Sequence, residues 1–200
     1  LLYKNDLNIG AFFIWLLQIL SASSGWLIIT KLSIVTIVSV LDDNHLWSNG
    51  KQIFDCVFNC LPNESLHKRN DLLKSDISII DLSVDFRLDH ENEYENWYGF
   101  KHSNIEVNNE FQYGLTEFNR DKIKKCKHIA NPGCYATSIL IPLIELIKQN
   151  VIKTDDIVID SKSGYSGAGK TKGKEELIKE VRENIRTYGI GDHKHIAEIN

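Results

Sequence analysis

A Pro-Gly turn that runs directly into an apolar-striped segment constrains this chain more than any other feature. Asn131-Pro132-Gly133 favours a tight turn, because proline fixes φ and glycine tolerates positive φ. The pattern predicts a helix that begins after the turn and continues to Lys148, with Cys134 on its first turn. The apolar residues that recur at helical spacing are Ile139, Leu143, Leu146 and Ile147.

Cys134 at this place is either a nucleophile or a small packing residue. Backbone N–H groups in a first helical turn have no partner inside the helix, and the helix dipole makes this end partly positive. Both effects favour thiolate over thiol and so activate the sulfur, and the same N–H groups can hold an oxyanion. A free cysteine also packs as a small hydrophobic residue. The sequence pattern leaves both interpretations open.

Six stretches, in order and spacing, carry a family resemblance that covers about residues 54–200. Residues 131–137 read Asn-Pro-Gly-Cys-Tyr-Ala-Thr, and residues 81–88 read Asp-Leu-Ser-Val-Asp-Phe-Arg-Leu. Together they resemble the motifs of N-acetyl-γ-glutamyl-phosphate reductases, within the wider semialdehyde dehydrogenase group. The other matching stretches are residues 97–99, 113–117, 162–169 and 191–195, the last followed by Glu198-Ile199.

The resemblance implies an α/β fold in two domains. Residues 1–133 are expected to form a Rossmann-like NAD(P)-binding domain, of which about the first 50 residues are divergent or damaged. Residues 134–200 are expected to begin an α+β catalytic and dimerisation domain that is truncated here. We expect a fragment, because the chain contains no Met and ends inside a motif that the family continues. The full-length protein is expected to be a cytoplasmic homo-oligomer.

The resemblance also implies a reaction. N-acetyl-γ-glutamyl phosphate is reduced by NADPH to N-acetyl-L-glutamate 5-semialdehyde with release of phosphate, a step of arginine biosynthesis. Cys134 attacks the acyl carbon, phosphate leaves, and the thioester is then reduced. His193 is expected to handle the protons. Arg87, Asn131 and His195 are expected to contact the substrate.

NADP is the cofactor that the resemblance implies. Residues 161–170 hold three glycines, three serines and two lysines, which indicates an anion-holding loop or merely a flexible one. The resemblance assigns this loop to the cofactor, together with Gly25 and with Pro62 at the end of a predicted strand. The cofactor contacts expected within the loop are Ser163, Gly164, Ser166, Gly167, Ala168 and Gly169.

His193 and His195 are two positions apart, so in an extended segment both side chains point to one face. Such a pair can begin a metal site, but no third ligand cluster accompanies it, and no metal is predicted. A pairing with Cys134 fits better, since an imidazole can take the thiol proton and later return it as a general acid. The family resemblance, together with the position after Gly191, favours His193 as the base.

The first 50 residues fit the family least well. Residues 7–30 carry no charge, which reaches the roughly 20 residues of a membrane span, but the polar run 21–25 interrupts them. The family accounts for them as a strand at 14–20, a dinucleotide loop at 21–26 and a second strand at 35–40. Only Gly25 remains of that loop's glycines, and the segment before Val35 is too short for a βαβ crossover. We favour a sheet-associated segment over a membrane span.

Further elements follow from the pattern of apolar residues and turns. Strands are expected within residues 53–61, 78–82, 129–130 and 157–160, and helices at 64–74, 119–127 and 174–186. Asp85 and Arg87 follow one of the strands and either pair with each other or serve the site. The aromatic residues Trp97, Tyr98 and Phe100 are expected to pack their loop against the domain.

Composition limits the class of protein. A formal net charge of −4 and a pI near 6.0 give no reason to expect nucleic acid as a partner. The resemblance implies a small-molecule substrate and phosphate as the partners. Four cysteines without zinc-ligand spacing fit a reduced protein. An aspartate-semialdehyde dehydrogenase-like enzyme is the nearest alternative, disfavoured by residues 81–87. A non-catalytic remnant, perhaps membrane-tethered through residues 7–30, is the alternative from another class.

Overall fold

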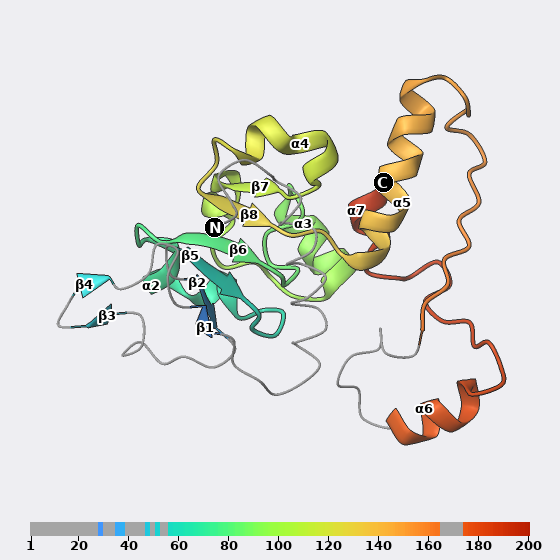
Figure 1. Ribbon diagram of the computed structural model, residues 1–200, viewed down its shortest axis with the longest axis horizontal. Helices are drawn as coiled ribbons and strands as arrows, with labels where there is room; N and C mark the ends of the chain where they lie inside the picture. The colour runs from blue at the N-terminus through green and yellow to red at the C-terminus, as the bar shows by residue number, and fades with distance from the viewer. Residues whose placement is uncertain (1–27, 30–34, 39–46, 49–50, 53–55, 165–173) are drawn as a thin grey trace. The chain divides into compact units, whose positions relative to one another are not determined.

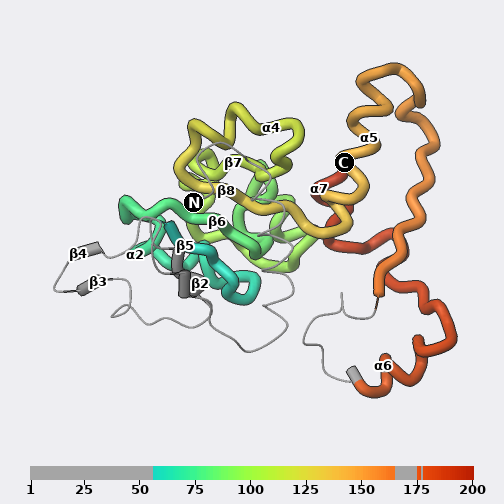
Figure 2. Tube along the Cα trace, in the orientation of Figure 1, coloured from blue at the N-terminus to red at the C-terminus, as the bar shows by residue number. Residues whose placement is uncertain are grey.

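The computed structural model describes residues 28–29, 35–38, 47–48, 51–52, 56–164 and 174–200 (Figures 1 and 2). They belong to two compact units. The larger comprises residues 28–161 and 187–200, and the described part of the smaller comprises 162–164 and 174–186, with helix α6 (Lys174–Val181). The predicted strand at 14–20 and dinucleotide loop at 21–26 lie outside the described residues.

A six-stranded, mostly parallel sheet forms the centre of the larger unit (Figure 1). β2, β5, β6, β8 and β7 are parallel neighbours, and β1 pairs antiparallel with β2. This sheet and its helices confirm the predicted α/β fold class. The strand order is β1 (Ile28–Ile29), β2 (Val35–Val38), β5 (Cys56–Asn59), β6 (Ser78–Asp81), β8 (His128–Ala130) and β7 (Phe111–Tyr113).

The remaining elements of the larger unit are short, apart from two helices. α4 (Thr116–Ile123) follows β7, and α5 (Cys134–Lys148) follows β8, as Figure 1 shows. Among the others, β3 (Trp47–Ser48) and β4 (Lys51–Gln52) pair as a separate two-stranded sheet. The helical turns are η2 (Leu66–Lys68), α2 (Asn70–Leu73), α3 (Glu91–Glu93), η3 (Tyr94–Tyr98), η4 (Ile105–Glu110) and α7 (Ile196–Ile199).

At the carboxyl edge of the sheet, polar residues at or just after the ends of three strands bond to one another. Asn59 and Asp81 are register partners at the ends of β5 and β6, and Asn59 Nδ2 donates to Asp81 Oδ1 at 2.6 Å. Just beyond β8, the Asn131 N–H donates to the Asp81 carbonyl oxygen at 2.8 Å. In open α/β sheets, ligands bind outside this edge. Cys134 begins α5 three residues further on.

The apolar core explains why one predicted helix is wrong. Residues 64–74 were expected to form a surface helix, but the chain instead makes η2 and α2, with a break at Arg69 (φ −93°, ψ 72°). The break turns three leucines into the core, where they pack with strand residues such as Val57 and Ile79. Burying a leucine stabilises the fold by about 2 kcal/mol, which outweighs helix continuity. The buried leucines are Leu66, Leu72 and Leu73.

Two further differences concern strands. The strand predicted at 157–160 is wrong: these residues are irregular, and Val158 is 92% exposed. No neighbouring strand pairs with them among the described residues, and an apolar run needs such pairing to form a sheet. β7 was not predicted, because a three-residue edge strand carries too little alternation to stand out. α4 also begins earlier than expected, at Thr116, and α6 ends earlier, at Val181.

The aromatic loop packs as predicted. Tyr98 and Phe100 are buried in a cluster with Val84, Leu88 and Tyr94, and Trp97 packs against it. The Tyr94 hydroxyl donates to the Leu88 carbonyl oxygen at 2.9 Å and accepts from the Leu88 N–H at 2.9 Å. This reciprocal pair satisfies a phenol that is fully buried, and so fixes the loop against the segment after β6.

The thiols and the uncharged N-terminal run were further expectations. Cys60, Cys126 and Cys134 are free thiols. The reduced state of the protein stays a prediction. In the part of the chain that the structure describes, no helix is long and apolar enough to cross a membrane. Most of the uncharged run at 7–30 lies outside that part.

A buried imidazole lies inside the sheet. His128 in β8 has no exposed surface, and its ring stacks on Phe111 with 4.9 Å between centroids. Its Nδ1 accepts the Ile79 N–H at 3.2 Å, so the neutral ring carries its proton on Nε2. Burial, with a smaller effect from Lys127, lowers the pKa of His128 to about 4. The Glu110 carboxylate is 3.9 Å from Nε2 but is exposed, and does not offset the burial.

We therefore expect His128 to make folding stability depend on acidity. Below the unfolded pKa of about 6.5, the unfolded chain binds a proton that the folded chain excludes, so stability falls from pH 6.5 towards pH 4 by at most about 1.4 kcal/mol per pH unit. His128→Asn keeps an acceptor for Ile79 but does not titrate, so its stability should fall less over this range. Urea unfolding at pH 7, 6 and 5 measures the difference between the two chains.

Identical pH dependence of wild type and variant would contradict this prediction. Burial also lowers the pKa values of His67 and His102, so the variant should retain part of the acid sensitivity. The informative quantity is therefore the change in slope, and not its disappearance.

Candidate active site

Cys134 is the first residue of α5, and its side chain is exposed. The 15-residue helix has the extent that the apolar stripe predicted. Gly133 precedes it with an extended backbone (φ −64°, ψ 154°), and no side chain caps the first turn. The Gly133 carbonyl oxygen accepts the Thr137 N–H at 2.8 Å and the Thr137 hydroxyl at 2.9 Å. The thiol is therefore presented to solvent at a helix start, and is not the buried packing residue of the alternative interpretation.

The turn before Cys134 is held by two bonds from other parts of the chain. The Asn131 N–H donates to the carbonyl of Asp81, and the Gly133 N–H donates to Glu198 Oε2 at 2.9 Å. Asn131 itself is buried, and its Nδ2 donates to the Pro132 carbonyl oxygen at 3.2 Å. A backbone anchored at both ends gives the thiol a defined position.

His193 and His195 come together at the start of α5. Their ring centroids are 4.8 Å apart, and the His195 N–H donates to His193 Nδ1 at 3.2 Å. The Tyr135 ring lies at 5.2 Å from His193 and 5.9 Å from His195. The segment is a turn and not the extended run expected, because the Ile196 N–H closes back on the His193 carbonyl.

The two imidazoles rest on two glycines. A Cβ on Gly133 would overlap the His195 ring, with Cε1 only 2.7 Å away. Gly189 has φ +61°, and a Cβ there would lie 2.9 Å from His193 Cδ2. His195 thus faces the residue before Cys134, while His193 lies between Gly189 and Tyr135.

The electrostatic setting of His195 suits a neutral imidazole. Burial lowers its pKa, Glu198 opposes that shift, and Arg87 and His193 reinforce it. A neutral ring has a nitrogen that can accept a proton near neutral pH. His195 Nδ1 is buried, without a hydrogen-bond partner among the described residues.

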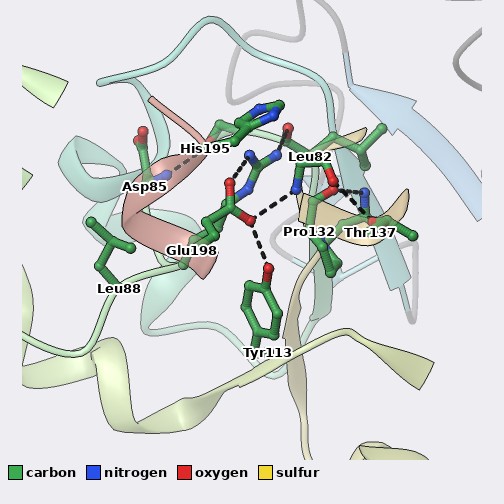
Figure 3. Close-up of polar contacts among 12 residues, drawn as sticks. Leu82, Asp85, Leu88, Tyr113, Pro132, Thr137, His195 and Glu198 are labelled. Atoms are coloured by element: carbon green, nitrogen blue, oxygen red, sulfur yellow. Dashed lines mark hydrogen bonds and ion pairs between the residues drawn. The ribbon is translucent and has the colours of Figure 1, made fainter. Parts of the chain in front are cut away.

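Arg87 forms a buried ion pair with Glu198, and not with Asp85. Arg87 Nη1 donates to Glu198 Oε1 at 3.0 Å, with the two side chains 6% and 0% exposed. Figure 3 shows the Glu198 carboxylate between this guanidinium and the Tyr113 hydroxyl, which donates to Oε2 at 2.8 Å. Asp85 faces elsewhere: its carboxylate accepts the N–H groups of Glu64 at 2.8 Å and His67 at 3.1 Å.

Pro62 lies exposed just beyond β5, at the same carboxyl edge of the sheet. The Asp85 carboxylate fixes the following turn at Glu64, whose φ is +68°. Ser83 connects this turn to the sheet, because its Oγ accepts the Asp85 N–H at 3.1 Å and donates to Asp81 at 2.8 Å. Burial raises the pKa of Asp81 to about 6, although the amide of Asn59 opposes the shift.

The predicted cofactor loop is only partly within the described residues. Ser163 and Gly164 are exposed and belong to the smaller unit, where Ser163 Oγ donates to the Gly164 carbonyl at 3.3 Å. Gly25 and the rest of the loop lie outside: Ser166, Gly167, Ala168 and Gly169. Across the ranges that are described, no group of three or more His, Cys, Asp or Glu residues could hold a metal ion.

The structure thus brings together four of the five predicted catalytic and substrate residues around the start of α5: Cys134, Asn131, His193 and His195. Arg87, the fifth, reaches the same turn through Glu198. Tyr113 and Glu198 were not among the predicted site residues. Their signal was present, since both lie in stretches that carry the family resemblance and Glu198 follows His195 by one helical turn.

Two family models match the chain. The semialdehyde dehydrogenase NAD binding domain matches residues 39–126, and the semialdehyde dehydrogenase dimerisation domain matches residues 134–200. Between them they cover most of the chain, including Cys134, His193 and His195, whereas Asn131 and Gly133 lie in the gap between the two matches.

Several curated relatives are named as N-acetyl-gamma-glutamyl-phosphate reductases. A probable N-acetyl-gamma-glutamyl-phosphate reductase, chloroplastic, of Arabidopsis thaliana is 44% identical over 82% of this chain and 39% of its own length. The reductase of Lachnoclostridium phytofermentans is 48% identical over 62% of this chain and 36% of its own length. The reductase of Afipia carboxidovorans is 42% identical over 77% of this chain and 44% of its own length. The chain spans less than half the length of these relatives. Both model matches agree with these names, and the chain belongs to the N-acetyl-γ-glutamyl-phosphate reductase family of semialdehyde dehydrogenases.

Proposed function

We propose that this chain is part of an NADP-dependent reductase that converts N-acetyl-γ-glutamyl phosphate to N-acetyl-L-glutamate 5-semialdehyde and phosphate, in arginine biosynthesis. One observation carries the proposal: an exposed cysteine begins α5, and two imidazoles lie against the residues on either side of it, Gly133 and Tyr135. That arrangement suits a thiol nucleophile with a proton acceptor at hand. The names of the relatives supply the substrate.

The chemistry at Cys134 divides one difficult reaction into two easier steps. The sulfur bonds to the acyl carbon, the C–O bond to phosphate breaks, and phosphate leaves with that electron pair. Backbone N–H groups at the start of α5 would hold the oxygen that becomes negative on the way. His193, the predicted base, takes the thiol proton; His195, whose ring lies against Gly133, is the second candidate. Asn131, Arg87 and His195 are the proposed substrate contacts.

The residues at the carboxyl edge of the sheet fit a nicotinamide cofactor. The match to the NAD binding domain supports a nicotinamide dinucleotide, and NADP is the form that we propose. Pro62 is exposed where β5 ends, on the turn that Asp85 braces, at the edge where open α/β sheets bind ligands. Pro62 is one proposed cofactor contact, and the family resemblance proposes as others Gly25, Ser163, Gly164, Ser166, Gly167, Ala168 and Gly169. When bound, the cofactor supplies the hydride that reduces the thioester.

Other parts of the proposal concern assembly and compartment. The match to a dimerisation domain supports a homo-oligomer. The cytoplasm stays a prediction, because two plant relatives are named chloroplastic. An aspartate-semialdehyde dehydrogenase-like enzyme would use the same thiol, but the relatives' names favour the N-acetylated substrate. A non-catalytic remnant gives no reason for an exposed thiol beside paired imidazoles.

Cys134→Ser should abolish activity in the full-length protein, because an alcohol at this place is a far weaker nucleophile. The assay is phosphate-dependent reduction of NADP by the semialdehyde. Cys126→Ser is the matched control, a free thiol outside the site, and should keep wild-type activity. A Cys134→Ser enzyme within tenfold of wild type, a barrier change of only about 1.4 kcal/mol, would refute the nucleophile assignment.

His193→Asn and His195→Asn should have unequal effects in the same assay. Because His193 is the proposed base, His193→Asn should lower kcat by about a hundredfold or more. His195→Asn should mainly raise KM, as the loss of a substrate contact does. If His195→Asn removes turnover and His193→Asn does not, the roles are reversed. That outcome would agree with the contact between His195 and Gly133.

Substitutions at two glycines test whether the position of the His193 ring matters, without changing either histidine. Gly189 and Gly191 both have positive φ, +61° and +76°, but a Cβ at Gly191 would meet nothing within 4 Å. Alanine at either position should destabilise folding by about 1–2 kcal/mol, measured by urea unfolding. Only Gly189→Ala should also lower kcat, tenfold or more, because it displaces the His193 ring. Equal kcat values in the two variants would count against a catalytic role for His193.

A further inference from the structure

Glu198 is a fully buried carboxylate that joins three distant parts of the chain. Its side chain has no exposed surface, and it lies in the four-residue helix α7. Oε1 accepts from Arg87 Nη1 at 3.0 Å, and Oε2 accepts from the Tyr113 hydroxyl at 2.8 Å and the Gly133 N–H at 2.9 Å (Figure 3). These donors come from the segment after β6, from the end of β7 and from the turn that precedes α5.

The network has only one arrangement of donors and acceptors. A guanidinium and a backbone N–H can only donate, so the carboxylate must accept from both. Burial, with a further effect from Glu198, raises the pKa of Tyr113, so its phenol stays protonated and also donates. A buried carboxylate is very costly to hold unless it is paired and hydrogen-bonded, and a fully bonded network resists rearrangement. Glu198 is therefore rigid relative to Gly133.

That rigidity sets the relation between the thiol and the imidazoles. Gly133 directly precedes Cys134, and the Glu198 N–H donates to the His195 carbonyl oxygen at 3.1 Å. One residue thus connects the turn that presents the sulfur with the turn that presents His195. The His195 ring lies against Gly133 as a result.

Glu198 also orients Arg87. One nitrogen, Nη1, donates to Glu198, and another, Nη2, donates to the Leu82 carbonyl at 2.9 Å. Nε is buried, and it lacks a hydrogen-bond partner in the described part of the chain. The guanidinium is held firmly, yet it has N–H groups left for another acceptor beside the catalytic turn.

We propose that Glu198 is a positioning residue for the reaction: its carboxylate holds Gly133, Arg87 and the His195 turn in one geometry at Cys134. The inference rests on the proposed function. Glu198 touches neither substrate nor cofactor in this account, and acts through the groups that it binds. A residue that only stabilised the fold would leave the reactivity of Cys134 unchanged in a folded variant.

The test compares Glu198→Gln, Tyr113→Phe and Tyr98→Phe in the full-length protein. Glutamine has the same shape, but its amide nitrogen cannot accept hydrogen bonds, so it cannot serve all three donors. In this variant kcat should fall at least fiftyfold, while KM for NADP changes less than twofold. Tyr113→Phe removes one of three donors and should lower kcat about five- to twentyfold. Tyr98→Phe is the matched control, since that hydroxyl is buried without a partner among the described residues, and it should match wild type.

Alkylation by iodoacetamide gives a readout that is independent of the reaction. The labelling rate of Cys134 is measured by mass spectrometry relative to Cys126, together with the melting temperature. Cys134 is already exposed, so a looser turn cannot raise its access. Glu198→Gln should instead slow its labelling at least threefold, because the thiol loses its ordered surroundings. If the wild type is inactive, the proposed function fails and alkylation still decides the positioning role.

Unchanged kcat and unchanged labelling in folded Glu198→Gln would overturn the inference. If that variant does not fold, Tyr113→Phe decides. Loss of kcat there with Tyr98→Phe intact supports the role, and equal kcat in both tyrosine variants refutes it.

Discussion

The carboxyl edge of the sheet depends on one buried side chain, Asp81. Its carboxylate accepts from the Asn59 amide and from both the N–H and the hydroxyl of Ser83, while its backbone carbonyl accepts from Asn131. These bonds tie the ends of β5 and β6 to the segment that leaves β8. Hydrogen bonding is the condition on which a carboxylate can be buried at all. The turn at Asn131 and the thiol of Cys134 follow directly from this edge of the sheet.

Two buried carboxylates, Asp81 and Glu198, hold different parts of the site in place. Asp81 fixes the strand ends beneath the turn, and Glu198 fixes the turn itself to Arg87, Tyr113 and the histidine segment. Both are satisfied by donors from different parts of the chain, so the site is assembled only when the whole larger unit is folded. An exposed thiol can then be held firmly by polar groups that solvent does not reach.

The buried titratable groups pull stability in opposite directions with acid. His128, with its pKa lowered to about 4, excludes a proton that the unfolded chain binds, so it favours unfolding as the pH falls. Asp81, with its pKa raised to about 6, binds a proton that the unfolded chain releases, so it favours folding over the same range. The acid sensitivity of the wild type includes this balance, together with the contributions of His67 and His102, and substitution at His128 removes one of these contributions.

Sequence alone determined what depends on near neighbours: the turn at 131–133, the helix from Cys134, the central strands and, through its motifs, the family. Tertiary structure decided what depends on distant partners. The helix predicted at 64–74 is broken because burial of three leucines in the core outweighs helix continuity: Leu66, Leu72 and Leu73. Residues 157–160 form no strand, because no described strand pairs with them. Arg87 pairs with Glu198, which is 111 residues away in the sequence, and not with Asp85, its near neighbour in the sequence. Local periodicity reports which residues prefer burial, but only the folded chain determines which buried charges meet.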